Sequence, residues 1–355
     1  MRVAVVGAGV SGSAAAALLS RAGLTVKLLD MSPRYVKPCG EVVPAETLGH
    51  AERCGLPRPP LVEPISSFVF VDASRSTVRR FDFGYPVWYS IDKGGWVEAL
   101  QAQAGGVEAR PVRSPERLAR EAKLDLVVDA RGPFGGRGVR IPVWRAYTRN
   151  TGLDAAVLVF HGSRLGFAWA FPHGDSLNIG AGFLGVREPR SLGLRLLHRA
   201  FQLLSLKPPD DGLRGAYSLV TVLPSLDLGS PRLPRVGEAA GLIYAPGGEG
   251  IRPALLSGCA LAQAYTREED VERAFRRYLG AVQPLVDEVR VARLALLAAA
   301  PAAGLVPRLL ESASPRYVEA WLSGRIYRVK LLLEAFLGSA LRVEGRGGEE
   351  RLEPR

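Results

Sequence analysis

Short apolar runs alternate along this chain with longer stretches in which apolar residues recur at helical spacing. Residues 2–6 form the first run, which is apolar after its opening arginine, as in a strand buried on both faces of a parallel sheet. A helical pattern follows over residues 11–22 and ends at Gly23, and residues 24–30 return to a strand pattern. This order predicts a β-α-β unit at the N-terminus.

Further apolar runs predict two groups of antiparallel strands. These strands cover residues 65–71, 77–83 and 86–91 in the first group, and 155–160, 166–171 and 177–183 in the second. Residues 34–44 predict a polar loop, and residues 124–130 form another apolar run before a glycine. Helices are predicted at 94–104, at 191–204 and over most of 254 to about 341, with prolines at 284, 301, 307 and 315 as breaks.

Three glycines, Gly7, Gly9 and Gly12, lie between the first strand and the first helix. This spacing permits a tight turn, the close approach of a pyrophosphate and close packing of the helix, whose N-terminus attracts negative charge. Asp30 ends the second strand, where a carboxylate would bind the ribose of adenosine. The segment therefore predicts a dinucleotide site, with a bare structural turn and a capping role for Asp30 as the alternatives.

A second glycine-rich segment covers residues 235–258 and leads into another helical pattern. A ligand that touches both glycine turns must be long, and FAD is such a ligand. Flavoproteins of the p-hydroxybenzoate hydroxylase type carry Gly-Asp where this chain has Gly237 and Glu238, and that acid binds the ribityl chain. Gly247, Gly248, Gly250 and Ile251 would then bring a helix N-terminus to the flavin ring, where its dipole stabilises negative charge. A plain glycine-rich loop is the alternative.

These patterns together predict an α/β fold. It consists of a Rossmann-type FAD-binding domain, an inserted antiparallel β-sheet domain for the substrate, and a helical C-terminal region. The FAD-binding domain is assigned residues 1–60, 90–140 and 225–285, the substrate domain 61–89 and 141–224, the C-terminal helices 286–343, and a flexible tail 344–355.

The amino-acid composition limits the classes of partner that the protein is expected to bind. The 355 residues carry a formal charge of +11, which suits an anionic membrane face, an acidic protein or an acidic substrate. No run of five or more Lys or Arg residues occurs, so a nucleic-acid partner is disfavoured. The apolar stretch 294–306 is shorter than the roughly 20 residues of a spanning helix. We expect a soluble or peripheral protein.

The cysteines argue against a metal site and against a disulfide framework. Cys39, Cys54 and Cys259 form no Cys-x-x-Cys pair, and the chain has four histidines. No metal is therefore expected, and a reducing cytoplasm fits best. Cys54 and Cys259 are interpreted as core residues.

A more selective signature appears at residues 37–41, Lys-Pro-Cys-Gly-Glu. Together with residues 247–251 and the following Ser257-Gly258, it resembles the geranylgeranyl reductase family of flavoproteins. Residues 166–172 also resemble that family's Tyr-x-Trp-x-Phe-Pro stretch, with Phe167 in place of Tyr. The resemblance covers roughly residues 1 to 265. It implies an FAD enzyme that reduces isolated C=C bonds in isoprenoid chains, such as those of membrane lipids.

The resemblance also implies roles for individual residues. Lys37, Pro38 and Gly40 would lie against the flavin, and Ala130 and Gly132 belong to a segment that passes the cofactor. Lys93 stands where the family has an arginine that contacts FAD, which keeps the charge and loses the bidentate fork. The residues expected to line an apolar substrate tunnel are Trp169, Phe171 and Pro172.

The implied reaction needs a proton source, because an isolated alkene accepts a hydride poorly unless its other carbon is protonated. Cys39 is the first candidate for this catalytic role, and Glu41 or a bound water is the alternative. On residue type alone an inert buried residue is the favoured interpretation of Cys39, and the flanking Pro38 and Gly40 bring the catalytic interpretation level with it.

The functional hypothesis is thus an FAD-dependent oxidoreductase that acts on geranylgeranyl or polyprenyl chains. The alternatives are a flavin monooxygenase or halogenase of the same fold, and a degenerate protein that binds FAD or lipid without turnover. Electrons would come from NAD(P)H or from a small acidic carrier such as ferredoxin. Residues 316–341 carry basic and aromatic residues at helical spacing, which suits either a packed helix or one that lies on the inner membrane face of a cytoplasmic protein.

Overall fold

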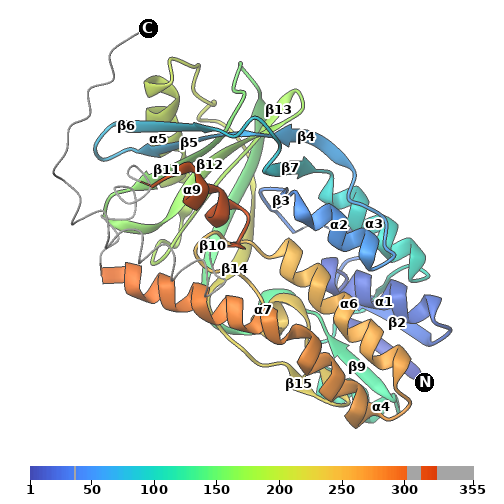
Figure 1. Cartoon of the computed structure of the whole chain (residues 1–355). Helices are drawn as coiled ribbons and strands as arrows, with labels where there is room; N and C mark the ends of the chain where they lie inside the picture. The colour runs from blue at the N-terminus through green and yellow to red at the C-terminus, as the bar shows by residue number, and fades with distance from the viewer. Residues whose placement is uncertain (36, 302–312, 326–355) are drawn as a thin grey trace, which may run out of the picture.

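The computed structural model describes residues 1–325 except 36 and 302–312. Its N-terminal part contains a parallel four-stranded sheet in the order β8-β2-β1-β9. The bounds are β1 Arg2–Val6, β2 Thr25–Asp30, β8 Glu108–Ala109 and β9 Leu126–Asp129. Helix α1 (Val10–Arg21) packs between α3 (Lys93–Gln103) and α6 (Ile251–Arg267), so a late segment of the chain completes the N-terminal unit (Figure 1).

The second large sheet has seven strands, in the order β14-β10-β13-β12-β11-β5-β6. Its strands are β5 Ser67–Asp72, β6 Thr77–Asp82, β10 Arg137–Arg149, β11 Ala156–His161, β12 Arg164–His173, β13 Ser176–Phe183 and β14 Ala216–Ser225. Helix α5 (Pro189–Leu203) covers one face and α9 (Pro315–Leu322) packs on the other. Apolar side chains fill both faces, so this sheet is buried on both sides.

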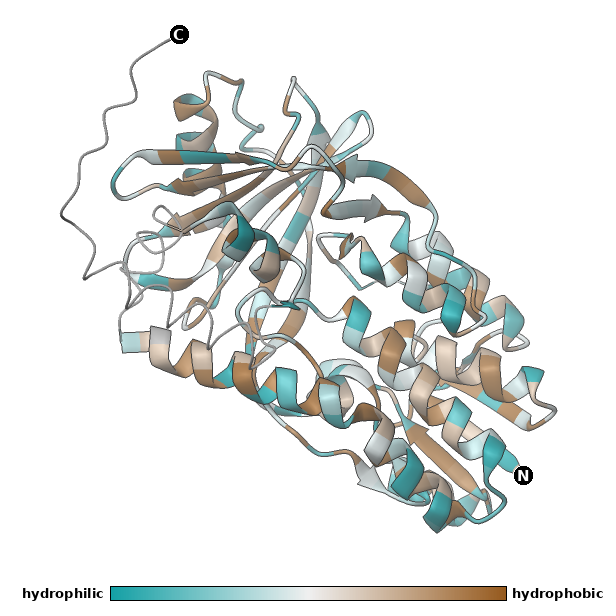
Figure 2. Cartoon of the chain, in the orientation of Figure 1, coloured by the Kyte–Doolittle hydropathy of each residue, from teal (hydrophilic) through white to brown (hydrophobic). Residues whose placement is uncertain are grey.

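A smaller three-stranded sheet connects the two parts, in the order β3-β7-β4. Its bounds are β3 Val42–Pro44, β7 Trp88–Ile91 and β4 Leu61–Ile65. The remaining elements are α2 Glu46–Arg53, α4 Pro115–Glu121, β15 Gly229–Ser230, β16 Leu233–Pro234 and α7 Val271–Ala299, with 3-10 turns η1 at Gly132–Phe134 and η2 at Gly237–Ala240. Figure 2 shows hydrophobic residues concentrated in the strands of both large sheets, whereas α7 mixes hydrophobic and hydrophilic residues along its length.

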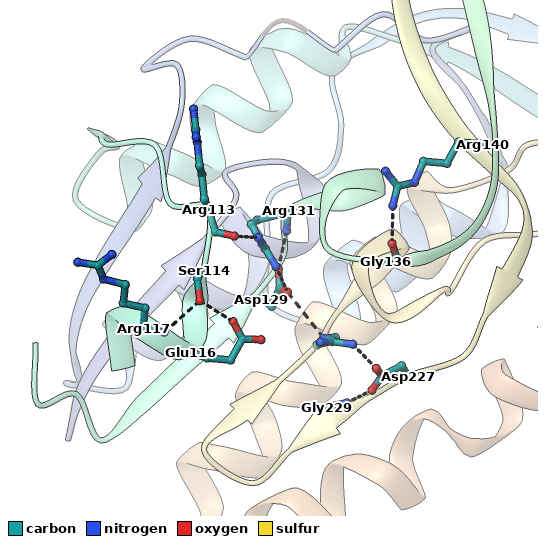
Figure 3. Close-up of polar contacts among 11 residues, drawn as sticks. Arg113, Ser114, Glu116, Arg117, Asp129, Arg131, Gly136, Arg140, Asp227 and Gly229 are labelled. Atoms are coloured by element: carbon teal, nitrogen blue, oxygen red, sulfur yellow. Dashed lines mark hydrogen bonds and ion pairs between the residues drawn. The ribbon is translucent and has the colours of Figure 1, made fainter. Parts of the chain in front are cut away.

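A network of ion pairs between side chains connects β9 to the β15–β16 hairpin at the edge of the parallel sheet (Figure 3). The fully buried carboxylate of Asp129 accepts hydrogen bonds from Arg131 Nε at 2.9 Å and Nη2 at 2.8 Å. Arg235 lies 3.7 Å from Asp129 and also pairs with Asp227. Because two guanidinium groups surround this carboxylate, its charge is compensated despite its burial.

The predicted fold class is confirmed, including the β-α-β unit and the sheet inserted after it. Five predicted strands belong to the seven-stranded sheet, but β5 and β11 pair in parallel rather than antiparallel. The predicted strand 86–91 lies instead in the three-stranded sheet, where its partners β3 and β4 fix it. Helix α7 continues through Pro284, and the expected tail 344–355 and much of the C-terminal helical region lie outside the described residues.

Cys259 lies in the hydrophobic core and Cys54 packs against it, as predicted, but the expectation that the cysteines form no disulfide was wrong. Cys54, just after α2, and Cys259, in α6, form a disulfide with their Cα atoms 6.0 Å apart. Sequence spacing gave no hint of this pair, because 205 positions separate the two residues. Cys39 is the free cysteine.

Within the described residues, no helix combines the length and the apolar character that crossing a bilayer requires. The same residues contain no group of three or more His, Cys, Asp or Glu side chains able to hold a metal ion.

Candidate active site

One continuous cavity of about 300 Å³ runs from the first glycine turn to the apolar face of the seven-stranded sheet. Gly9 lies at one end, and Phe167 and Trp169 lie in the part lined by the sheet. Most of the predicted site residues line it, namely Gly9, Lys37, Pro38, Cys39, Gly40, Glu41, Lys93, Ala130, Gly132, Trp169, Phe171, Glu238, Gly247, Gly248, Gly250 and Ile251. The tertiary structure therefore gathers segments that are far apart in sequence around one space.

Two glycine turns line the cavity, and each lies at the N-terminus of a helix. Helices α1 and α6 follow Gly9 and Gly250 and, like α2 and α9, have no side-chain cap, whereas α3, α4, α5 and α7 are each capped by a side chain. A Cβ added to Gly9, Gly247 or Gly248 would meet no atom within 4 Å. These two helix N-termini thus border the cavity, and the space beside Gly9, Gly247 and Gly248 is open, as an anionic ligand at a helix N-terminus requires.

The other predicted glycines act through packing. Gly7 has a φ of 107°, and a Cβ there would strike the carbonyl of Ala130. A Cβ at Gly12 would strike the Gly7 carbonyl, and one at Gly237 would meet Ser11. These three residues lie outside the cavity lining and allow α1, β9 and η2 to approach closely.

Asp30 lies beside the first glycine turn at the end of β2. One carboxylate oxygen accepts a hydrogen bond from the Ala8 N–H at 2.6 Å, and the other accepts one from Ser32 at 3.2 Å. Asp30 is outside the lining of the cavity, so its predicted contact with a ribose stays a prediction.

Glu238 is already held by the protein. Its Oε2 lies 2.6 Å from Lys37 Nζ, and its Oε1 accepts a hydrogen bond from the Thr221 N–H at 2.9 Å. Lys37 comes from the N-terminal part of the chain and Thr221 from β14. The longer acid at this position therefore bridges the two parts of the cavity wall.

The loop of residues 37–41 lies where the parallel sheet and the seven-stranded sheet meet. Asn178, buried in β13, donates to the Cys39 carbonyl at 2.9 Å and accepts from Trp169 Nε1 at 3.1 Å. A Cβ on Gly40 would stand 3.0 Å from the ring of Phe171, so only glycine fits there without displacement. Close packing on the sheet thus fixes the position of Cys39.

Cys39 and Lys93 both line the cavity. The N–H of Glu41 donates to the Cys39 sulfur at 3.4 Å, and the ammonium of the buried Lys93 lies over the Tyr35 ring at 4.9 Å. Burial opposes the charge of Lys93, but interactions with Cys39 and Tyr35 outweigh this effect and raise the pKa of Lys93 above its ordinary value. Lys93 is thus a basic group on the cavity wall that is only 3% exposed.

The Glu41 carboxylate points to the seven-stranded sheet. It accepts a hydrogen bond from Tyr147, lies 3.6 Å from Arg145 and lies 3.9 Å from His173. Burial lowers the pKa of His173 below its ordinary value, and Arg145 adds to this effect while Glu41 opposes it. Sequence reasoning missed Arg145, Tyr147 and His173, since only strand pairing brings them to Glu41.

Aromatic side chains line the end of the cavity that lies on the sheet. Trp169 and Phe171 stack with ring centroids 6.0 Å apart, and Trp88 meets Phe171 edge-on at 5.6 Å. Pro172, predicted with them, is buried but does not line the cavity. Trp321, Leu322 and Leu296 from the C-terminal helices complete this apolar wall.

A buried ionic cluster supports α6 behind the second glycine turn. Arg252, 2% exposed, lies 2.8 Å from Glu249 and 3.0 Å from Glu46 of α2, and its guanidinium stacks over Tyr244 at 4.8 Å. Burial raises the pKa of Glu249 above its ordinary value, although Arg252 works against this. The cluster holds the loop of residues 247–250 against α2 and α6.

A parallel sheet and a seven-stranded mixed sheet that share one cavity form a fold that is also found in solved flavin-dependent proteins. Residues 5–40 match a family model described as an NAD(P)-binding Rossmann-like domain. A flavin-dependent brominase has the same fold, with a TM-score of 0.68 at 11% identity over 96% of this chain and 98% of that one.

The sequence is similar to the geranylgeranyl diphosphate reductase of Rhodobacter capsulatus, with 25% identity in a 303-residue alignment that covers 73% of this chain and 73% of that protein. A geranylgeranyl bacteriochlorophyll reductase-like protein from Thermoplasma acidophilum shares the fold, with a TM-score of 0.61 and 18% identity over 91% of both chains. The resemblance inferred from residues 37–41 and 247–251 is thereby confirmed.

Proposed function

We propose that this protein is an FAD-dependent oxidoreductase that reduces C=C bonds in geranylgeranyl or longer polyprenyl chains. The observation that carries the proposal is the single cavity, which is polar at two uncapped helix N-termini and apolar along the seven-stranded sheet. Cys39 lies between these two regions. A cofactor and an apolar chain in the same cavity would meet at this thiol.

The residues present suit FAD. The N-terminus of α1 and the neighbouring Asp30 would take the pyrophosphate and the adenosine ribose, and the N-terminus of α6 would face the flavin ring. Lys37 and Glu238 would border the ribityl chain. When bound, FAD supplies the hydride for the reduction. The chain's own residues would supply the proton, exclude water and orient the alkene.

Proton delivery is assigned to Cys39, and Glu41 is the second candidate. The Glu41 carboxylate already accepts a hydrogen bond from Tyr147 and faces Arg145. These contacts suit a residue that anchors the loop better than one that donates a proton to the substrate. The stacked rings of Trp169 and Phe171 would hold the isoprenoid against the thiol and keep water out.

The visible spectrum and an anaerobic turnover test the proposal. We expect bound or readily absorbed FAD, and we expect a geranylgeranyl lipid to reoxidise the reduced protein without oxygen and to gain two hydrogens per bond. No uptake of FAD would contradict any enzyme role and favour a degenerate binding protein. Reoxidation that needs oxygen, with a hydroxylated or halogenated product, would instead identify a monooxygenase or halogenase.

Two further features of the proposal concern partners. The charge of +11 suits an acidic electron carrier as the donor, with NAD(P)H as the other candidate. An isoprenoid lipid reaches a protein most directly from a bilayer, so we propose peripheral contact with the cytoplasmic membrane face. Binding to anionic vesicles that weakens with salt would support this contact, and its absence would contradict it.

A further inference from the structure

A second cavity lies on the face of the seven-stranded sheet that α5 covers. It has a volume of about 420 Å³ and runs along α5, and its lining includes the exposed Arg195 and Arg199 of that helix. Leu197, Ala200 and Phe201 pack the opposite side of α5 onto the sheet. The active-site cavity borders the other face of the sheet, where α9 packs, and no described residue lines both cavities. We call the second cavity the α5 groove.

Positive charge is concentrated in the α5 groove. Arg190, Arg195 and Arg199 line it together with His198. Helix α5 contains no acidic residue over its whole described length, Pro189–Leu203, so no carboxylate of the same helix compensates these side chains. Arg195 and Arg199 are four positions apart, a spacing at which like charges on a helix repel each other. The helix therefore carries an electrostatic cost that an anion in the groove would reduce.

Carboxylates of other segments leave most of this charge uncompensated. Asp211 lines the groove with its Oδ1 3.2 Å from His198 Nε2, but its side chain is 85% exposed, so water screens its charge. Glu188, the N-cap of α5, accepts hydrogen bonds from backbone N–H groups of the helix and from the Tyr217 hydroxyl. In the part of the chain that the structure describes, no carboxylate lies within ion-pair distance of the three guanidinium groups. The groove thus carries a net positive charge.

Contacts with neutral groups position two of the three arginines. Arg190 Nη2 donates to the Asp211 carbonyl at 3.0 Å, and Arg199 Nη2 donates to Ser76 Oγ at 2.7 Å. These bonds orient the guanidinium groups without neutralising them. Arg190 Nε is buried and has no acceptor among the described residues. A buried donor in this state commonly marks a partner outside the chain, a water or an ion, which agrees with the excess of positive charge.

We propose that the α5 groove binds a phosphate-bearing group, either of a soluble phosphate compound or of a phospholipid headgroup. Guanidinium groups bind phosphate oxygens through paired N–H donors, and several of them together suit an anion with more than one negative charge. The hydroxyl of Ser191 and the amide of Gln202 supply further donors. Of the described residues that line the groove, Leu194 alone is apolar, so the bound group is polar and is not a prenyl chain. This site is independent of the proposed function.

Titration calorimetry with inorganic diphosphate at constant ionic strength tests the soluble source. We expect the groove variant, Arg195→Gln with Arg199→Gln, to bind about tenfold more weakly than the wild type, because it loses charge-assisted hydrogen bonds. The matched control, Arg273→Gln with Arg276→Gln, removes two exposed arginines from α7 and should bind like the wild type. Diphosphate bound at the glycine turns of the active-site cavity would survive both double substitutions, so the difference between the two variants reports on the groove.

Flotation with phosphatidylglycerol vesicles tests the lipid source, and phosphatidylcholine vesicles are the control without net charge. If the groove variant loses binding to diphosphate alone, the ligand is a soluble phosphate compound. If it loses binding to the anionic vesicles, the ligand is a phospholipid headgroup. Should the double variant not fold, Arg195→Gln alone replaces it, since Arg195 makes no hydrogen bond or ion pair with the described residues. Equal behaviour of the groove variant and the α7 control toward both diphosphate and vesicles would overturn the proposal.

Discussion

At position 41 a glutamate adopts a backbone conformation that most residues avoid. Its φ is 56°, which costs on the order of 1 kcal/mol for a non-glycine residue. The carboxylate gains the Tyr147 hydroxyl and the Arg145 guanidinium, and the Glu41 carbonyl accepts the Ile91 N–H at 2.9 Å. These contacts offset the strain and turn the backbone so that Cys39 faces the cavity while Glu41 faces β10.

His173 makes this cluster sensitive to pH. Burial lowers the pKa of His173 below its ordinary 6.5, with Arg145 adding to the effect, and Glu41, Asp92 and Glu63 opposing it. The unfolded chain therefore binds the proton more readily than the folded one. The stability contribution of His173 is present above pH 6.5 and is lost as the pH falls through the lowered pKa.

The first prediction follows from that sign. Between pH 7.5 and pH 5 the melting temperature of His173→Gln should fall less than that of the wild type, because glutamine takes up no proton. His161→Gln, at the end of β11, is the matched control and should follow the wild type. Thermal melts of the three proteins across this range check it, and parallel losses in wild type and His173→Gln would contradict it.

The helices, strands and loops differ in how well the sequence alone predicted them. Strands β1 and β9 are nearly uninterrupted apolar runs, and β2 carries Val26, Leu28 and Leu29 around Lys27, so the hydrophobic pattern identified all three. Strand β10 was missed because four arginines interrupt its apolar positions, and β14 was missed with it. The glycine turns and the loop of residues 37–41 were readable as motifs. The contacts of Glu41 with Tyr147 and Arg145 were not, because they depend on how β10 packs against that loop.

Helix α9 borders the apolar part of the cavity. Trp321 packs edge-on against Phe70 with ring centroids 5.9 Å apart, and the next residue, Leu322, accepts a hydrogen bond from Trp88 Nε1 at 2.7 Å. Trp321 and Leu322 both line the cavity. The helix therefore closes the cavity over the sheet, opposite to the face covered by α5.

The second prediction concerns this closure. Trp321→Ala should widen the cavity and raise the preference for prenyl chains longer than geranylgeranyl, at a stability cost of about 1–3 kcal/mol for the half-buried ring. Competition between chains of two lengths, read by mass spectrometry, measures the preference. Trp321→Phe retains a ring and should shift it less. An unchanged preference in Trp321→Ala would show that α9 does not limit the chain.

The whole molecule is arranged around the junction of its two large sheets. Asn178, Glu238 and Glu41 each cross that junction, and all three reach the cavity wall or the loop that carries Cys39. On the opposite side of the cofactor region, α2 and α6 are joined by Arg252 with Glu46 and by the Cys54–Cys259 disulfide. Helix α6, whose N-terminus faces the cavity, is thus tied to α2 covalently.

The third prediction concerns this covalent tie. Protein prepared without reductant and then unfolded should show one reactive thiol per chain with a thiol-specific dye, since Cys39 is the free cysteine and the other two are paired. Reduction should lower the stability by about 2–4 kcal/mol, because the bond restricts the unfolded chain. The double variant Cys54→Ala, Cys259→Ala should melt near the reduced wild type and should not respond to reductant. Three reactive thiols before reduction would contradict the disulfide. A single reactive thiol together with a melting temperature that reduction does not change would mean that the packing of α2 on α6 alone holds the second glycine turn.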